Sequence, residues 1–139
     1  MHAVANVADF HANQSVVVFG AGPVGLLCMA VAKALGASRV IAVDIVQNRL
    51  DFAKNFAATD IYVPPPMEKD ESRIRYSERN AKKLMTDLGI EERGPKSINL
   101  VVDASGAEVS IQTGVLVAKI GGTFVQVRSN QCLSPVSRY

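Results

Sequence analysis

The chain has 139 residues, a length that suits a single domain with a sizeable hydrophobic core. Its 15 basic and 13 acidic residues give a formal net charge of +2, which is too small to indicate a nucleic-acid-binding protein. Hydrophobic residues make up 48% of the chain, yet no apolar run is long enough to predict a membrane-spanning helix. The first 15 residues are too polar for a secretory signal peptide, and two cysteines do not form a disulfide framework, so we expect a cytoplasmic protein.

A glycine-rich turn follows the first predicted strand, Ser15–Phe19, whose valines and phenylalanine are typical of a buried parallel strand. Gly20, Gly22 and Gly25 have the G-x-G-x-x-G spacing of a dinucleotide-binding turn. In such a turn the first glycine permits a tight bend, the second lets a pyrophosphate approach the main chain, and the third lets the helix pack closely on the strand. Main-chain N–H groups and the positive end of the helix dipole then face the phosphates.

A helix and a second strand complete this first unit. Gly36 is placed to end the helix, and Arg39–Val43 is the second apolar strand. Asp44 follows it, about 20 residues after the turn, where a carboxylate binds the ribose hydroxyls of a dinucleotide. The alternative is a glycine turn that serves only helix–strand packing, with Asp44 as a solvated acid at the end of a strand. The predicted buried face of the helix comprises Val24, Leu27, Cys28, Val31 and Leu35.

The rest of the chain repeats the alternation of helix and strand. This alternation predicts an α/β fold with a doubly wound parallel sheet, strand order 3-2-1-4-5, and a ligand crevice at the carboxyl ends of strands 1 and 4. Residues 128–139 show no periodicity, so we expect a coil or a disordered tail, no sixth strand and an open edge on the fifth. The remaining predicted elements are a helix over 47–57, a strand over 61–63, a helix from 74 or 76 to 88, a strand over Leu100–Asp103, a helix after residue 107 and a strand over 123–127.

Three further polar residues are candidates for the site, and two histidines are not. Arg49 follows the acid of the second strand and either contacts the adenosine through its planar guanidinium or is a plain surface arginine. Asp103 and Ser105 lie at the predicted rim and either contact the ligand or, for Asp103, cap the next helix. His2 and His11 have no partner at ligand spacing, so neither predicts a metal site.

Three segments together resemble the cofactor domain of zinc-containing medium-chain dehydrogenases. They are residues 16–45, 100–114 and 121–127, and the resemblance is greatest to the xylitol, L-arabinitol and sorbitol dehydrogenases. It covers about residues 1–127 and implies an NAD-binding Rossmann domain of an enzyme that oxidises a polyol to a ketose or catalyses the reverse. Residues 1–14 are then the remnant of a helix that links two domains, and residues 128–139 are a tail foreign to the family.

The resemblance also implies roles for individual residues. Pro23 and Val24 belong to the phosphate turn, where Val24 lends a main-chain N–H, and Val127 begins a stretch near the nicotinamide. Asp44 favours NAD over NADP, because its charge repels a 2′-phosphate and Ile45 offers no compensating cation. With Ser105 added from its place at the rim, the predicted cofactor-binding set is Gly20, Gly22, Pro23, Val24, Gly25, Asp44, Arg49, Ser105 and Val127.

The chain also departs from that family. There the zinc ligands, a cysteine, a histidine and a glutamate, come from a separate domain, and the metal polarises the alcohol oxygen while hydride passes to NAD. None of these ligands is expected here, and Arg128 stands where the family has a glycine. We therefore expect a cofactor-binding fragment with no catalytic residue and no metal ligand. The alternative is a non-catalytic module that senses NAD(H) or pairs with another chain, such as a second copy, through the edge of the fifth strand.

Overall fold

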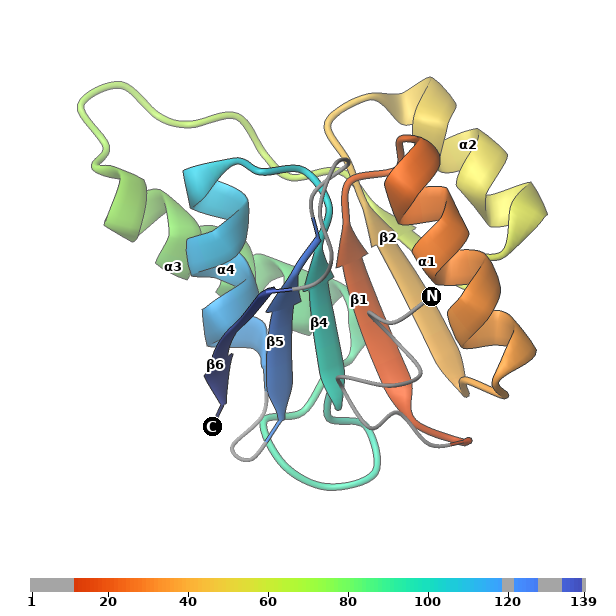
Figure 1. The fold of residues 1–139 in the computed structure, drawn as a ribbon. Helices are drawn as coiled ribbons and strands as arrows, with labels where there is room; N and C mark the ends of the chain where they lie inside the picture. The colour runs from red at the N-terminus through yellow and green to blue at the C-terminus, as the bar shows by residue number, and fades with distance from the viewer. Residues whose placement is uncertain (1–11, 119–121, 128–133, 139) are drawn as a thin grey trace.

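A six-stranded sheet lies between two layers of helices in the computed structural model of the chain, which describes residues 12–118, 122–127 and 134–138 (Figure 1). The strand order is β3-β2-β1-β4-β5-β6, and the first five strands are parallel, which confirms the predicted order 3-2-1-4-5. The strands are β1 (Ser15–Phe19), β2 (Arg39–Val43), β3 (Asp60–Tyr62), β4 (Leu100–Asp103), β5 (Thr123–Gln126) and β6 (Ser134–Arg138). The helices are α1 (Pro23–Ala34), α2 (Gln47–Phe56), α3 (Arg73–Leu88) and α4 (Glu108–Val117).

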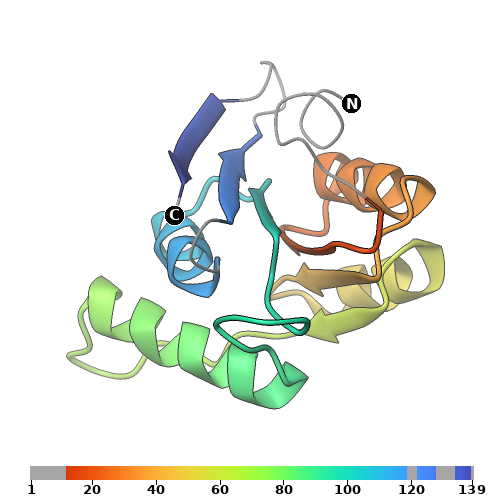
Figure 2. The ribbon, with the colours of Figure 1, turned by 90° about the horizontal axis from the view of Figure 1, so that it is seen from below.

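Helices cover both faces of the sheet. Helices α1 and α2 lie on one face and α3 and α4 on the other, as the view along the sheet shows (Figure 2). Successive side chains of a strand point to opposite faces, so Val16 and Val18 of β1 join the core beneath α1, whereas Val17 and Phe19 join the core beneath α3 and α4. All four are essentially inaccessible to solvent, which explains the continuous apolar run of this strand.

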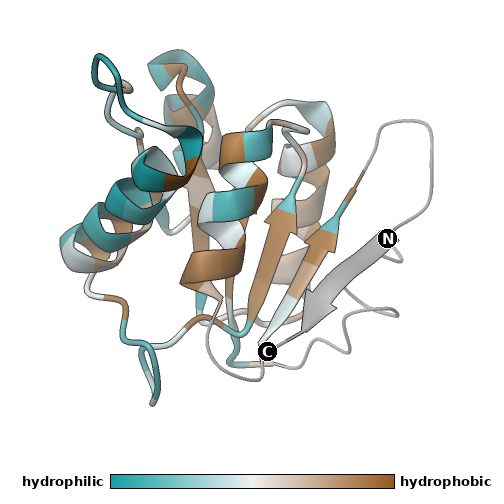
Figure 3. Ribbon diagram, turned by 90° about the vertical axis from the view of Figure 1, so that its left-hand side faces the viewer, coloured by the Kyte–Doolittle hydropathy of each residue, from teal (hydrophilic) through white to brown (hydrophobic). Residues whose placement is uncertain are grey.

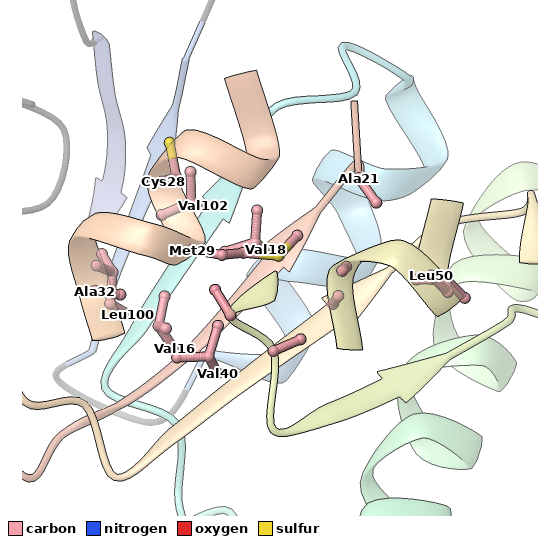
Figure 4. Close-up of a cluster of buried hydrophobic side chains, with 14 of the residues drawn as sticks. Val16, Val18, Ala21, Cys28, Met29, Ala32, Val40, Leu50, Leu100 and Val102 are labelled. Atoms are coloured by element: carbon pink, nitrogen blue, oxygen red, sulfur yellow. The ribbon is translucent and has the colours of Figure 1, made fainter. Parts of the chain in front are cut away.

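The buried face of α1 agrees with the prediction at Cys28 but not at Leu27 and Leu35. Cys28, Met29 and Ala32 are fully buried against the sheet (Figure 4), whereas Leu27 is 51% exposed and Leu35 is also exposed. The cause is steric. Gly25, in the first turn of α1, must face the end of β1, and this contact fixes the rotation of the whole helix. Burial raises the pKa of the Cys28 thiol to about 11, which fits a small core residue with no reactive role.

The prediction that there is no sixth strand is wrong. Ser134–Arg138 forms β6 and pairs antiparallel with β5, although residues 128–139 were expected to contain no strand. An edge strand offers free main-chain N–H and C=O groups, and a partner can satisfy them without any apolar periodicity in its own sequence. Pro135 is tolerated because β6 is itself an edge strand, with a register shift at this point. The edge of β5, which the alternative interpretation uses for pairing with another chain, is therefore occupied.

Two further predictions concern the bounds of α3 and the N-terminal segment. Helix α3 begins at Arg73, before the predicted start at residue 74 or 76, because the hydroxyl of Ser72 caps it by accepting a hydrogen bond from the Arg75 N–H. The helix ends at Leu88, as predicted, with Gly89 in the left-handed conformation. His2, His11 and nearly all of the predicted remnant helix over 1–14 lie outside the described residues. Among the residues that are described, none of the helices has the length and apolar character needed to span a bilayer.

Candidate dinucleotide site

The glycine turn joins the carboxyl end of β1 to the first turn of α1. Gly20 adopts a φ of +104°, which favours glycine, and its N–H donates a 2.8 Å hydrogen bond to the carbonyl of Val43. A Cβ atom on Gly25 would lie 1.8 Å from the carbonyl oxygen of Gly20, so no other residue fits there. The first and third glycines therefore have the bending and packing roles that the spacing predicts.

Gly22 has a different relation to its surroundings. It is the N-cap of α1, with an extended conformation, and a Cβ atom built on it would meet nothing within 4 Å. No contact within the described chain therefore requires a glycine at this position. The open space in front of its main chain is where a diphosphate would approach, so this residue fits a dinucleotide turn.

The N-terminus of α1 is also open. The first N–H groups of a helix have no carbonyl to bond within it, and here Pro23 occupies the first position. No side chain of the described residues caps this end, and its first turn contains no acid. The N–H groups that follow Pro23, including that of Val24, are thus available to an anion, which the positive end of the helix dipole also attracts.

Asp44 holds the turn from the side of β2. Its Oδ2 atom accepts a 2.8 Å hydrogen bond from the N–H of Ala21, and its Oδ1 atom accepts one of 2.9 Å from the N–H of Val46. The side chain is only 7% exposed, so the alternative of a solvated acid at the end of a strand is wrong. Each carboxylate oxygen keeps a further lone pair, so both can still accept a hydrogen bond from a ribose hydroxyl.

Arg49 lies beside this carboxylate without a hydrogen bond to it. Its Nη1 atom is 3.9 Å from the Oδ2 atom of Asp44, and 59% of its side chain is exposed. An exposed ion pair at this distance stabilises the fold little. The guanidinium is therefore free to turn toward a ligand, and both sequence interpretations of Arg49 stay open.

The loop after β4 lies beside the glycine turn. Asp103 is fully buried, and its carboxylate accepts hydrogen bonds from the N–H and the hydroxyl of Ser105 and from the N–H of Gly106, at 3.2, 2.7 and 3.2 Å. Its oxygens are thus engaged by its own loop, which favours the structural interpretation of this acid. Ser105 is exposed, and its hydroxyl oxygen also accepts a hydrogen bond from the N–H of Ala107.

The loop after β4 and the glycine turn contact each other. The Ala104 N–H donates a 2.8 Å hydrogen bond to the carbonyl of Phe19, and a Cβ atom on Gly20 would lie 3.1 Å from the main chain of Ala104 and Ser105. The N–H of Val127 donates a 2.8 Å hydrogen bond to the carbonyl of Asp103. The structure therefore brings the predicted residues from the ends of β1, β2, β4 and β5 to one edge of the sheet.

Sequence reasoning missed the two main-chain donors that Asp44 binds. One of them carried a signal, since an aspartate that accepts a hydrogen bond from the N–H two residues later is a common turn, and Val46 has this spacing. The contact with Ala21 joins two turns that are far apart in sequence, so no local pattern indicates it. Within the described residues, no group of three or more histidine, cysteine, aspartate or glutamate side chains is placed to hold a metal ion.

These features define a class of protein, the doubly wound α/β domains whose glycine turn and helix N-terminus face an acid at the end of the second strand. The chain belongs to the zinc-binding dehydrogenase family, whose model matches residues 23–132. It is 51% identical over 121 residues to D-xylulose reductase A of Aspergillus niger, and 51% identical over 122 residues to D-xylulose reductase A of Aspergillus oryzae. These matches cover 86% and 88% of this chain but only 30% of each relative.

Solved structures agree with this assignment. Benzyl alcohol dehydrogenase from Acinetobacter calcoaceticus matches 89% of this chain with a TM-score of 0.63 and 31% identity, over 30% of its own length. Zinc-dependent alcohol dehydrogenase 2 from Streptococcus pneumonia matches 89% of this chain with a TM-score of 0.69 at 22% identity, over 31% of its own length, and this shows the shared fold alone. The chain thus spans less than a third of the length of each of these four relatives.

Proposed function

We propose that the chain is the NAD(H)-binding domain of a polyol dehydrogenase that interconverts a polyol and a ketose. The names of the Aspergillus relatives, both D-xylulose reductases, support this substrate class. The observation that carries the binding proposal is Gly22, whose missing side chain leaves open space beside an uncapped helix N-terminus. Because the chain spans only 30% of these relatives, the activity is proposed for a whole enzyme of which this domain is one part.

In this proposal the residues bind and orient the dinucleotide. The N–H groups at the start of α1, including that of Val24, hold the diphosphate, and Asp44 accepts hydrogen bonds from the adenosine ribose. Arg49 steadies the adenosine, while Ser105 and Val127 border the same cleft. Bound NAD supplies the hydride acceptor. Asp44 makes the site selective for NAD, because its negative charge opposes a 2′-phosphate.

No catalytic residue is assigned to this chain. The described residues offer no set of ligands for zinc, so we derive no step through a metal here. We propose that the chemistry needs residues from outside this domain, and that the protein is cytoplasmic, in keeping with its free buried Cys28. The alternative of a non-catalytic dinucleotide-binding module gives the same binding but requires no such residues.

Calorimetric titration with NAD, NADP and ADP-ribose tests the binding proposal. We expect NAD and ADP-ribose to bind and NADP to bind more weakly. Equal affinity for NAD and NADP would contradict the role of Asp44, and no binding of any of the three would contradict the proposal as a whole. A second assay combines the chain with Zn²⁺, NAD and xylitol or sorbitol and follows NADH absorbance, where turnover would show that no residue outside the chain is needed.

A further inference from the structure

The segment between β3 and α3 follows the strand that lies next to β2 and its terminal acid. Residues 63–72 form this segment, and we call it the β3–α3 loop. None of these ten residues, all of which the structure describes, is buried. The last part of the loop and helix α3 are largely hydrophilic, as the teal ribbon in Figure 3 shows. The apolar core therefore does not fix the position of the loop, and polar contacts must do so.

Two side chains of α3 hold the loop. The guanidinium of Arg79 binds the carboxylate of Glu71 through two hydrogen bonds, of 2.9 Å from Nε and 2.8 Å from Nη2. The same Nη2 atom donates a 3.1 Å hydrogen bond to the carbonyl of Pro66. The hydroxyl of Tyr76 donates one of 2.8 Å to the carbonyl of Pro65. One turn of the helix thus binds the loop at two points along its length.

The contact between Arg79 and Glu71 is more than an exposed ion pair. Only 10% of the Glu71 side chain and 32% of the Arg79 side chain are exposed. The Oε1 atom of Glu71 also accepts a 2.9 Å hydrogen bond from the N–H of Glu68, and the Cζ atom of Arg79 lies 5.4 Å from the centre of the Tyr76 ring. Because two planar groups joined by two parallel hydrogen bonds have a defined orientation, this contact holds the loop in one arrangement.

The first residue of the loop lies beside Asp44. Strands β2 and β3 are parallel, with Val43 opposite Tyr62, so the next residue of each strand, Asp44 and Val63, leaves the sheet at the same edge. The N–H of Asp44 donates a 3.3 Å hydrogen bond to the carbonyl of Tyr62. Val63 and Ile45 are 41% and 79% exposed, so each strand end has an accessible apolar residue next to the acid.

We propose that Arg79 is a positioning residue for the dinucleotide site. By holding the β3–α3 loop, it keeps Val63 in place beside the adenosine half of the ligand, which Asp44 binds in the proposed function on which this inference rests. A loop that is already ordered costs less free energy when the ligand binds. Arg79 does not contact the ligand in this account, and it acts through Glu71 and the carbonyl of Pro66.

Glu71→Gln and Arg79→Lys test this role. Glutamine lacks the charge and lysine cannot form the two parallel hydrogen bonds, so both variants release the loop. If the released loop keeps its present arrangement about a tenth of the time, the dissociation constant for ADP-ribose rises roughly tenfold. Calorimetry of the folded variants measures this constant. Inorganic pyrophosphate shares only the contacts at the N-terminus of α1, so its dissociation constant, measured by NMR titration, should stay at the wild-type value.

Asp87→Asn is the matched control, because Asp87 forms an ion pair with Lys83 further along α3 and should leave both constants unchanged. Variants that bind ADP-ribose as tightly as wild type overturn the inference and leave the proposed function intact. An equal loss of affinity for ADP-ribose and pyrophosphate also overturns it, because Arg79 then supports the fold as a whole. A wild-type chain that binds no ADP-ribose contradicts the proposed function and this inference with it.

Discussion

The Oδ2 atom of Asp44 accepts a hydrogen bond of 2.8 Å from the N–H of Ala21, so the acid at the end of β2 holds the glycine turn that follows β1. The same carboxylate also binds the turn that begins α2, through the N–H of Val46. One side chain therefore positions two of the main-chain segments that border the site. The role in ribose binding that we propose for Asp44 is added to this structural one.

Replacing Asp44 by alanine should weaken both the fold and the binding of NAD. Loss of two hydrogen bonds to a charged acceptor, one partly buried and one exposed, should lower the free energy of unfolding by about 2 kcal/mol, measured by urea denaturation. The free energy of NAD binding, measured by calorimetry on the folded variant, should weaken by about 1–3 kcal/mol. Asp51→Asn is the control, because Asp51 is an exposed acid of α2 and should change neither quantity. Unchanged NAD affinity in Asp44→Ala would remove Asp44 from the binding site.

Gly22 and Gly25 form a matched pair of substitution sites. Gly22→Val should abolish NAD binding, because the new side chain fills the space proposed for the diphosphate, and should cost at most about 1 kcal/mol of stability as a poorer N-cap. Gly25→Ala should destabilise the fold by about 3 kcal/mol or more, because its Cβ would collide with the carbonyl oxygen of Gly20. Thermal unfolding and NAD titration of both variants separate the two effects. A Gly22→Val variant that binds NAD normally contradicts the proposed phosphate position.

The contributions of Asp103 and Ser105 to stability and to NAD binding can be separated by substituting each in turn. Asp103→Asn should lower the free energy of unfolding by about 2–3 kcal/mol, because an amide nitrogen then faces N–H groups inside a fully buried site. Ser105→Ala removes only the side-chain hydrogen bonds and should cost about 1 kcal/mol. Urea denaturation measures both. If Ser105→Ala also reduces NAD affinity while the fold is retained, the hydroxyl contacts the cofactor as the sequence analysis predicts.

The free energy of unfolding should depend on pH through Glu71, which lies between β3 and α3. Hydrogen bonds from Arg79 are the largest cause that lowers the pKa of Glu71, from its usual 4.5 to about 2. Because this pKa is lower in the folded state, the stabilisation is complete above the pKa of the unfolded chain and is lost as the pH falls from about 4.5 toward 2. Glu71→Gln should therefore be less stable than wild type at pH 7, and the difference should vanish near pH 2. A difference in unfolding free energy that is constant from pH 7 to pH 2 contradicts this account.

Sequence reasoning predicted the strands well and the helix surfaces less well. The runs that became β1, β2 and β4 have the predicted bounds, because buried parallel strands are continuous apolar segments bounded by turn residues. For α1 the prediction is confirmed at Cys28 and wrong at Leu27 and Leu35, because the contact of Gly25 with Gly20 fixes the rotation of the helix and turns these two leucines outward. Neither β6 nor the contact of Asp44 with Ala21 was predicted, because both depend on main-chain groups that carry no side-chain pattern.

The direction of β6 determines where the chain finishes relative to the site. Because β6 is antiparallel to β5, Arg138 is paired with Thr123, at the amino ends of the parallel strands. The glycine turn and Asp44 are at the other edge of the sheet. A fluorescent reporter or a surface-immobilisation handle joined after this strand would therefore be attached at the edge of the sheet opposite the glycine turn and Asp44, so the titrations above can be run on tethered protein.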